Sequence, residues 1–266
     1  MLACASGRIP YASTQRTVLL KGQRNVTKEL EVYDTIPPSA MVIVAHPDDA
    51  EFMVAGTFTR WSRGGCRTVY VLVTDGDKGS SDPTIARAEL AALRRAEQRE
   101  ACSIVGAQDV EFLHYEDGMV EPTLALRRDL ARLIRKHKPH AVMVQDPARY
   151  FGGRGYVNHP DHRAVGEAAL GAIYPTARDP LTFPELLADG FEPHKVKEVF
   201  ISSGDDADVI VNISEALDNK VAALLAHKSQ MGDWQPYETI AKWSGEAAKG
   251  HEFAHGETFK HLKLDD

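Results

Sequence analysis

The sequence has little that would tie it to a membrane, a disulfide framework or a nucleotide cofactor. No run approaches the roughly 18 apolar residues of a membrane-spanning helix, so no membrane span is expected. The three cysteines, Cys4, Cys66 and Cys102, include no CxxC pair and indicate no disulfide framework. Neither a Walker motif nor a GxGxxG fingerprint is present, which argues against a nucleotide. The N-terminus lacks the apolar segment of a secretory signal, so the cytoplasm is the expected compartment.

Basic residues are also fewer than acidic ones. Lysine and arginine number 31 against 38 acidic residues, which gives a formal net charge of −7 and a pI near 5.9. Such a surface attracts neither nucleic acid nor an anionic membrane, so we expect neither as a partner. With 266 residues, of which 43% are hydrophobic, the chain is able to bury the core of one large domain.

Strand-like and helix-like segments alternate along the chain. Apolar, β-rich runs predict strands over 41–45, 68–74, 109–113, 141–145, 198–203 and 208–213. Helical spacing predicts helices over 55–64, 83–105, 123–137, 161–173 and 214–228. This alternation predicts an α/β fold, a doubly wound and mostly parallel sheet with helices on both faces. We expect residues 1–37 to be a partly ordered N-terminal extension and residues 38–266 to form a single domain.

Two short clusters of metal-binding side chains stand out. His46-Pro47-Asp48-Asp49 directly follows the first strand, and His159-Pro160-Asp161-His162 lies beyond the loop after strand 141–145. Because open α/β sheets bind ligands at the carboxyl ends of their strands, both clusters are expected at the same edge. One such turn by itself is more often a helix cap than a metal site. Two of them at strand ends in one chain favour a metal site.

A catalytic zinc ion takes three protein ligands and leaves one position open. His46, Asp49 and His162 form a suitable set for Zn²⁺, with other divalent ions possible. Asp48 is then left over as the general base for a metal-activated water molecule.

The remaining two polar residues of the second cluster also suit a catalytic role. We expect His159 to lie over the substrate carbonyl as an imidazolium. Asp161 is expected to hold an imidazole in its working tautomer, the usual task of a carboxylate behind a metal ligand.

Further candidates end the second and third strands. Asp75 lies in Thr74–Asp77 and Asp117 precedes Gly118, and both are placed to contact a substrate. The alternative is that these Asp-Gly pairs are plain turns.

Taken together, the motifs resemble those of the PIG-L/LmbE-like zinc de-N-acetylases. The resemblance covers about residues 38–230 and lies in AHPDDAE (45–51), Ala55-Gly56-Thr57, TDGDKG (74–79), Arg95 with Glu97, NHPDHR (158–163) and HKSQ (227–230). It implies a Rossmann-like fold and the same zinc ligands and base. By the resemblance His159 would stabilise the tetrahedral intermediate, with Asp161 as its partner.

The resemblance also bears on the substrate side of the site. Arg95 and Asn158 lie within the shared motifs, and we expect both to bind substrate together with Asp75 and Asp117. His227 is expected either in the active site or as a histidine at the C-terminus of a helix.

We therefore predict a zinc-dependent hydrolase that removes an N-acyl group, acetyl foremost, from an amino sugar or a related small molecule. One alternative is an amidase that cleaves another amide, such as that of a thiol-sugar conjugate. The other is a non-catalytic Rossmann-like binding module in which the histidines only cap turns.

The Pro- and Asp-rich segment 174–195 predicts a long loop beside the site. Its apolar residues favour a homo-oligomer in which the segment borders the active-site entrance; they are Leu181, Phe183, Leu186, Leu187 and Phe191. The alternative is a monomer in which these side chains fold back onto their own sheet.

Overall fold

The computed structural model describes residues 29–152, 155–202 and 206–264. Most of the predicted N-terminal extension therefore lies outside the described residues. In the described part an eight-stranded sheet has the order β1-β9-β10-β8-β5-β2-β3-β4. Its strands are β1 (Glu31–Val32), β2 (Ser39–Val44), β3 (Arg67–Thr74), β4 (Asp109–Tyr115), β5 (Ala141–Gln145), β8 (Glu198–Ser202), β9 (Val209–Asn212) and β10 (Gly256–Lys263). A separate antiparallel pair joins β6 (Phe151–Gly152) to β7 (Tyr156–Val157).

The centre of the sheet is parallel. β2 pairs in parallel with β3 and β5, β3 with β4, and β5 with β8. β10 runs antiparallel to both β8 and β9. The predicted class, a doubly wound and mostly parallel α/β sheet, is confirmed.

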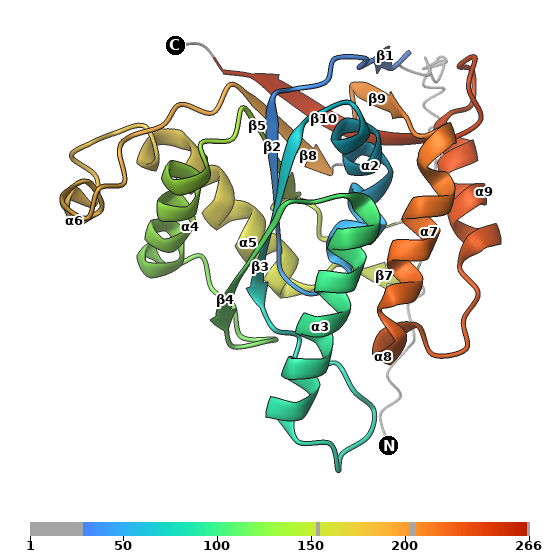
Figure 1. Ribbon diagram of the computed structural model, residues 1–266, viewed down its shortest axis with the longest axis horizontal. Helices are drawn as coiled ribbons and strands as arrows, with labels where there is room; N and C mark the ends of the chain where they lie inside the picture. Colours follow the sequence, from blue (N-terminus) through green and yellow to red (C-terminus); the bar gives the residue numbers. More distant parts are fainter. Residues whose placement is uncertain (1–28, 153–154, 203–205, 265–266) are drawn as a thin grey trace, which may run out of the picture.

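Helices cover both faces of this sheet (Figure 1). Along β2 the buried side chains alternate, so that Val42 and Val44 join one core cluster while Met41 and Ile43 join the other. The first cluster is covered by α2 (Ala55–Arg63), α3 (Arg87–Val105) and α7 (Leu217–Ala226). The second is covered by α4 (Leu124–His137) and α5 (Pro160–Gly171).

Short helices complete the chain. α1 (Asp49–Met53) precedes α2, a π-helix (Ala172–Thr176) follows α5, α8 (Lys228–Met231) follows α7, and α6 (Pro184–Ala188) and α9 (Tyr237–Ala247) lie in the connections. The predicted helix 214–228 is divided into a 3₁₀ turn (Ser214–Ala216), α7 and α8, with His227 at the junction. No helix in the described ranges has the length and apolar content needed to cross a membrane.

The sheet includes residues that precede residue 38. Glu31 and Val32 pair with β9, and Tyr33 is buried against Phe200 of β8 with its ring centroid 5.0 Å away. These residues, assigned by the sequence to the extension, are thus part of the sheet and its core.

The prediction that segment 174–195 borders the active site is wrong. His194 donates from Nε2 to the carbonyl oxygen of Pro139, at 2.7 Å, and Pro139 precedes β5 at its amino end. The segment therefore reaches the sheet edge opposite to the carboxyl ends of the parallel strands. Leu186 is buried, and Phe183 and Phe191 pack against the core, as the alternative expected, whereas Leu181 and Leu187 are exposed.

A buried arginine explains why this segment folds back. The guanidinium of Arg135, on α4, donates to the carbonyl oxygens of Thr176, Ala177 and Asp179 at 2.9, 3.1 and 2.7 Å. Backbone acceptors that a solvent-facing loop would leave to water are satisfied internally here.

Candidate metal centre and active site

Both predicted clusters lie at the carboxyl edge of the sheet. His46 follows β2, and α5 begins at Pro160 with His159 as its N-cap. Helix α5 is able to approach the end of β5 closely because residue 166 is glycine. A Cβ atom there would lie 2.3 Å from the backbone oxygen of Gln145. The close packing of α5 on β5 brings the second cluster to the first.

Asp49 lies between two imidazoles. Its Oδ2 is 3.3 Å from Nδ1 of His46, and its Oδ1 is 3.1 Å from Nε2 of His162. Ligand atoms of one tetrahedral zinc, each about 2.0–2.2 Å from the metal, lie roughly 3.3–3.6 Å apart. The backbone N–H of His46 and Nε2 of Gln145 donate to Asp49 Oδ2, at 2.8 and 3.1 Å, and fix its orientation. The donor types fit a divalent cation, and each imidazole faces a different oxygen of Asp49.

In both His46 and His162, the ring nitrogen that points away from Asp49 has a partner of its own. Nε2 of His46 lies 3.3 Å from Asp161 Oδ2 and 3.1 Å from Asp117 Oδ1, so it is the protonated nitrogen. Nδ1 of His162 lies 3.1 Å from Oδ1 of Asn158 and donates to it. Because these contacts keep a proton on the nitrogen that points away from Asp49, the nitrogen that faces Asp49 is the one that a metal ion would bind in exchange for a proton.

The charge around His46 also favours a cation. Burial by itself lowers the pKa of His46, but hydrogen bonds to Asp117, Asp161 and Asp49 outweigh it and raise the pKa to about 12. A group of carboxylates that holds a proton this firmly in a buried place also attracts a metal ion.

Two further groupings contain His46, and one of them also contains His162. One nitrogen each of His46, His159 and His162 lies within 4.8 Å of the others, and so do ligand atoms of His46, Asp117 and Asp161. Among these, Asp161 is committed to the backbone N–H groups of Gly118 and Val120, at 2.7 and 3.2 Å. The imidazole that Asp161 contacts by its carboxylate is that of His46, whereas its nearest approach to Nδ1 of His159 is 4.0 Å.

Asp48 is held apart from Asp49 by a different set of contacts. Its backbone has a φ of 96°, in the left-handed region that a non-glycine residue seldom adopts. Its N–H donates to Oε1 of Gln98 at 3.2 Å, and Arg94 Nη2 donates to its Oδ2 at 3.2 Å. Burial, and then the charge of Asp49, raise the pKa of Asp48 to about 7. A carboxylate with a pKa near neutrality is suited to accept a proton in catalysis.

Arg94 was not singled out in the sequence, where Arg95 was chosen instead. Arg94 is 4% exposed and also donates to the carbonyl oxygens of Pro47 and Gly76, at 2.6 and 2.8 Å. Arg95 donates to Asp75 Oδ2 at 2.6 Å, and the same oxygen lies 2.8 Å from Nδ1 of His114.

The surroundings of His159 favour the neutral form of its imidazole ring. Its Nδ1 accepts a hydrogen bond from the backbone N–H of Asp161, at 3.2 Å, which leaves Nε2 to carry the proton. Burial and the nearby charge of His46 lower the pKa of His159. The ring therefore offers an N–H donor without a full positive charge.

His227 is fully buried at the C-terminal end of α7. Its Nε2 lies 3.2 Å from Oε2 of Glu51, whose Oε1 accepts from Gln98 Nε2 at 3.0 Å. Gln98 also holds Asp48, so His227 is two residues removed from the expected base. His227 lies at the C-terminal end of a helix, as one expectation has it. Through Glu51 and Gln98 it also supports the site, which agrees in part with the other expectation.

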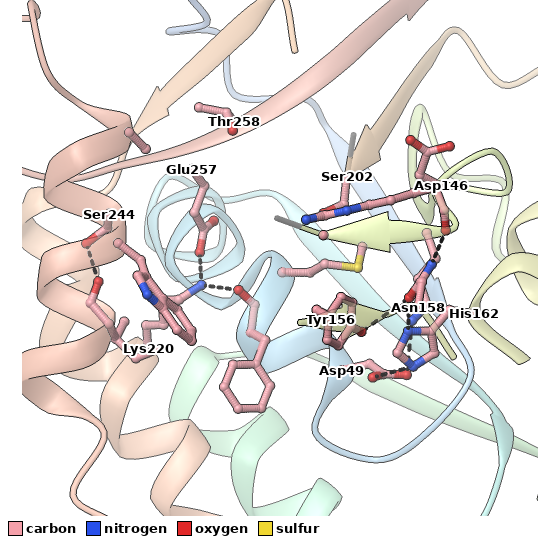
Figure 2. Close-up of a pocket in the computed structure, with 18 of the residues that line it drawn as sticks. Asp49, Asp146, Tyr156, Asn158, His162, Ser202, Lys220, Ser244, Glu257 and Thr258 are labelled. Carbon is pink, nitrogen blue, oxygen red and sulfur yellow. Dashed lines mark hydrogen bonds and ion pairs between the residues drawn. The ribbon is translucent and has the colours of Figure 1, made fainter. Parts of the chain in front are cut away.

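A pocket of about 800 Å³ opens beside Asp49 and His162. Of the four predicted substrate-binding residues, Asn158 lines the pocket. Asp117 contacts His46 instead, and Asp75 and Arg95 contact each other. Figure 2 shows Asp49 and His162 at one side and Lys220, Ser244 and Glu257 at the other. This distal end, made by α7, α9 and β10, was missed in the sequence, and its lining residues are Lys220, Ile240, Trp243, Ser244, Ala247 and Glu257.

The parallel sheet, the cation-binding cluster at its carboxyl edge and the second, separately held carboxylate define a metal-dependent hydrolase. Residues 41–173 match the PIG-L family, described as GlcNAc-PI de-N-acetylase. The chain belongs to this family, as its motifs predicted.

Named relatives agree with that membership. The chain is 30% identical over 225 residues to diacetylchitobiose deacetylase of Thermococcus kodakarensis, a match that covers 82% of each chain. It is 30% identical over 199 residues to the probable N-acetyl-alpha-D-glucosaminyl L-malate deacetylase 2 of Bacillus subtilis, over 71% of this chain and 82% of the relative. The solved structure of N,N'-diacetylchitobiose deacetylase from Pyrococcus horikoshii aligns with a TM-score of 0.75 and 28% identity, covering 85% and 84% of the two chains.

Proposed function

We propose that this protein is a zinc-dependent deacetylase that hydrolyses the N-acetyl group of an amino sugar or of a related small molecule. The observation that carries the proposal is that two adjacent carboxylates have different partners. Asp49 lies between His46 and His162, while Asp48 is held by Arg94 and Gln98. Hydrolysis of an amide by metal-activated water uses both a cation site and a base beside it.

His46, Asp49 and His162 would hold the zinc ion, and another divalent ion would suit the same donors. A cation bound there supplies a Lewis acid that lowers the pKa of water and polarises a carbonyl oxygen. Asp161 and Asp117 orient His46, and Asn158 orients His162, by the contacts described above.

Asp48 is then the group that transfers the proton, and His159 is the hydrogen-bond donor. Asp48 accepts the proton of the water molecule that attacks the acetyl carbonyl carbon. Nε2–H of His159 donates to the carbonyl oxygen as negative charge develops on it. When the C–N bond breaks, the proton on Asp48 passes to the leaving amine, so the products are acetate and a free amino group.

Support for an amino-sugar substrate comes from the relatives, whose names specify deacetylation of diacetylchitobiose and of a glucosaminyl malate. Asn158, which lines the pocket, is proposed to contact the sugar. Asp117 is proposed to act through His46, and the Asp75–Arg95 pair by bracing the turn after β3.

The alternative is an amidase that cleaves a different amide, such as that of a thiol-sugar conjugate. A panel of N-acetylated amino sugars and sugar–thiol amides, assayed for released amine with the zinc-loaded protein, separates the two. Amine released from the acetylated sugars supports the proposal. Release only from the thiol conjugates would replace it by the alternative.

We further propose a cytoplasmic location and a homo-oligomer. Cys66 and Cys102 are buried free thiols, which suit a reducing compartment. The β6–β7 hairpin beside the pocket exposes Phe151 and Val157, an apolar surface that a second copy would cover. Light scattering at micromolar concentration tests the assembly, and a mass near 29.3 kDa with no heavier species would reject it.

A further inference from the structure

A line of buried polar side chains from three helices connects Asp48 to the end of α7. The backbone N–H of Asp48 donates to Oε1 of Gln98, on α3, at 3.2 Å. Nε2 of Gln98 donates to Oε1 of Glu51, on α1, at 3.0 Å. Nε2 of His227, at the end of α7, lies 3.2 Å from Oε2 of Glu51. Gln98, Glu51 and His227 are fully buried, so these polar groups have to satisfy one another.

The carboxylate of Glu51 fixes the direction of the hydrogen bonds in this line. An ionised carboxylate only accepts, so the end of the Gln98 amide that faces it has to be the NH₂ group. The carbonyl end of the same amide then faces Asp48, whose N–H it accepts. A reversed amide would set an oxygen against the carboxylate and an NH₂ group against the N–H of Asp48.

The imidazole of His227 holds Glu51 from the other side. In the described part of the chain its buried Nδ1 makes no hydrogen bond, and the bond that remains to the ring is the one from Nε2 to Glu51. An apolar side chain would fill this fully buried place without leaving a polar atom unpaired. The contribution of the imidazole is therefore its hydrogen bond to Glu51.

The backbone of Asp48 needs such support. Its φ of 96° and ψ of −28° lie in the left-handed region, and its carbonyl oxygen accepts the backbone N–H of Glu51 at 3.0 Å where α1 begins. A non-glycine residue keeps this conformation only where its surroundings hold it. Gln98 holds the N–H, as Arg94 holds the carboxylate. Rotation about φ would move the carboxylate away from its place beside Asp49.

We infer that Gln98 is a positioning residue for the general base Asp48. Its amide carbonyl holds the backbone N–H of Asp48, and with it the carboxylate beside the cation site. Glu51 and His227 fix the direction of that amide. The inference rests on the proposed function and adds to it a set of residues that do not line the pocket. Gln98 acts through Asp48 and has no part in the proton transfers.

The test exchanges the amide and the carboxylate. Gln98→Glu alone sets two buried carboxylates against each other and should lower kcat about tenfold or more with little change in KM, because misplacement of a reacting group by about 1 Å costs as much as 10²-fold. In the double variant Glu51→Gln with Gln98→Glu, the amide at position 51 accepts from His227 and donates to the carboxylate at position 98. That carboxylate accepts the N–H of Asp48, so kcat should recover about tenfold or more.

The variants are compared as zinc-loaded proteins on the plateau of each pH–rate profile, because the exchange moves a negative charge toward Asp48. Zinc content should equal that of the wild type, since the contacts of Asp49 with His46 and His162 are untouched. A merely structural role of Gln98 would lower Tm and leave the kcat of the folded protein unchanged.

A second pair of variants tests the far end of the line and serves if Gln98→Glu does not fold. His227→Gln offers an N–H donor in place of Nε2 and should keep kcat, whereas His227→Leu offers none and should lose it. Cys102→Ala is the matched control, because Cys102 lies on α3 with its Sγ 3.7 Å from Nε2 of Gln98 and has no hydrogen bond with Asp48. It should lower Tm but not kcat.

Two results would overturn the inference. One is a double variant that is no more active than Gln98→Glu. The other is an equal kcat in His227→Leu and His227→Gln.

Hydrogen exchange at the backbone N–H of Asp48, measured by NMR in the metal-free protein, separates this inference from the proposed function. We expect slow exchange in the wild type, fast exchange in Gln98→Glu and slow exchange again in the double variant. That pattern in a protein that releases no amine would overturn the function and leave the positioning role. Amine release with exchange that does not depend on residue 98 would overturn the positioning role alone, and the absence of both would overturn both.

Discussion

Arg94 donates from Nη2 to Oδ2 of Asp48, over 3.2 Å, from a guanidinium that also binds the carbonyl oxygens of Pro47 and Gly76. One buried cation thus joins the turn after β2 to the turn after β3 and holds the carboxylate between them. Asp48 and Asp49 are neighbours in the chain, but their side chains have different partners. This separation leaves Asp49 for the cation and Asp48 for the proton.

Asp48→Asn should retain the metal and lose turnover. A positioned general base contributes about 10²–10⁴-fold, and the amide cannot accept the proton. Asp49→Ala should instead lose the metal, because it removes the oxygens that face His46 and His162. Metal content and kcat of the two variants decide the matter. Loss of metal from the Asn variant together with its retention in Asp49→Ala would reverse the two roles.

The acidic limb of the pH–rate profile should respond to Arg94. Burial and the charge of Asp49 raise the pKa of Asp48 to about 7, whereas Arg94 lowers it. Only the ionised carboxylate is a base, so activity should rise with pH through this pKa, and a bound cation should place the limb below about 7. Arg94→Met removes a favourable charge and should move the limb to higher pH by about one unit or more.

Arg95→Met is the control for that shift, because Arg95 contacts Asp75 and not Asp48. Its acidic limb should stay in place. A limb that moves equally in both variants, or toward lower pH in Arg94→Met, would contradict the assignment of Asp48 as the base.

Gly166→Ala should weaken metal binding from a distance. The added methyl group would meet the backbone oxygen of Gln145 at 2.3 Å and push α5, which carries His162, away from β5. Overpacking of this kind costs about 1–3 kcal/mol of folding free energy. Gly171→Ala, on the same helix, meets only the flexible side chain of Arg127 and serves as the control. Equal zinc affinities in the two variants would show that the α5–β5 contact does not set the site.

Lys220→Met should destabilise the fold. Removal of one partner from a buried ion pair leaves Glu257 charged and costs about 3–5 kcal/mol. Lys249→Met removes a partner of the exposed pair with Glu246, at 3.6 Å, and should change little. Urea unfolding compares the two, and a similar small loss in both would mean that the Lys220–Glu257 pair is not a structural anchor.

Much of the fold and of the metal cluster could be predicted because the responsible signals are local. The near-continuous apolar run before His46 indicates a parallel strand covered on both faces, and His-Pro-Asp turns at strand ends place their side chains at one edge. The sequence motif indicates Arg95, but Arg94 is the arginine that contacts Asp48. A motif alone does not say which residues lie on the buried face of a helix. Leu90, Gln98 and Ala101 share the buried face of α3 with Arg94, at helical spacing.

The distal end of the pocket could not be predicted for a different reason. Lys220, Trp243 and Glu257 belong to α7, α9 and β10, and no short motif links them. They meet because β10 inserts antiparallel between β8 and β9, and strand order of this kind is set by tertiary packing. The folding back of segment 174–195 likewise depends on contacts with distant residues, among them Arg135.

Bound metal and Asp48 together are proposed to hydrolyse an N-acetyl amino sugar. The most direct measurement follows amine released from N-acetylglucosamine and its disaccharide while the metal content of the same protein is titrated with zinc. We predict release that rises in proportion to bound zinc up to one equivalent, stops on chelation, and falls about 10²–10⁴-fold in zinc-loaded Asp48→Asn. Release that is independent of bound metal, or no release from either sugar at one equivalent, would rule out this mechanism.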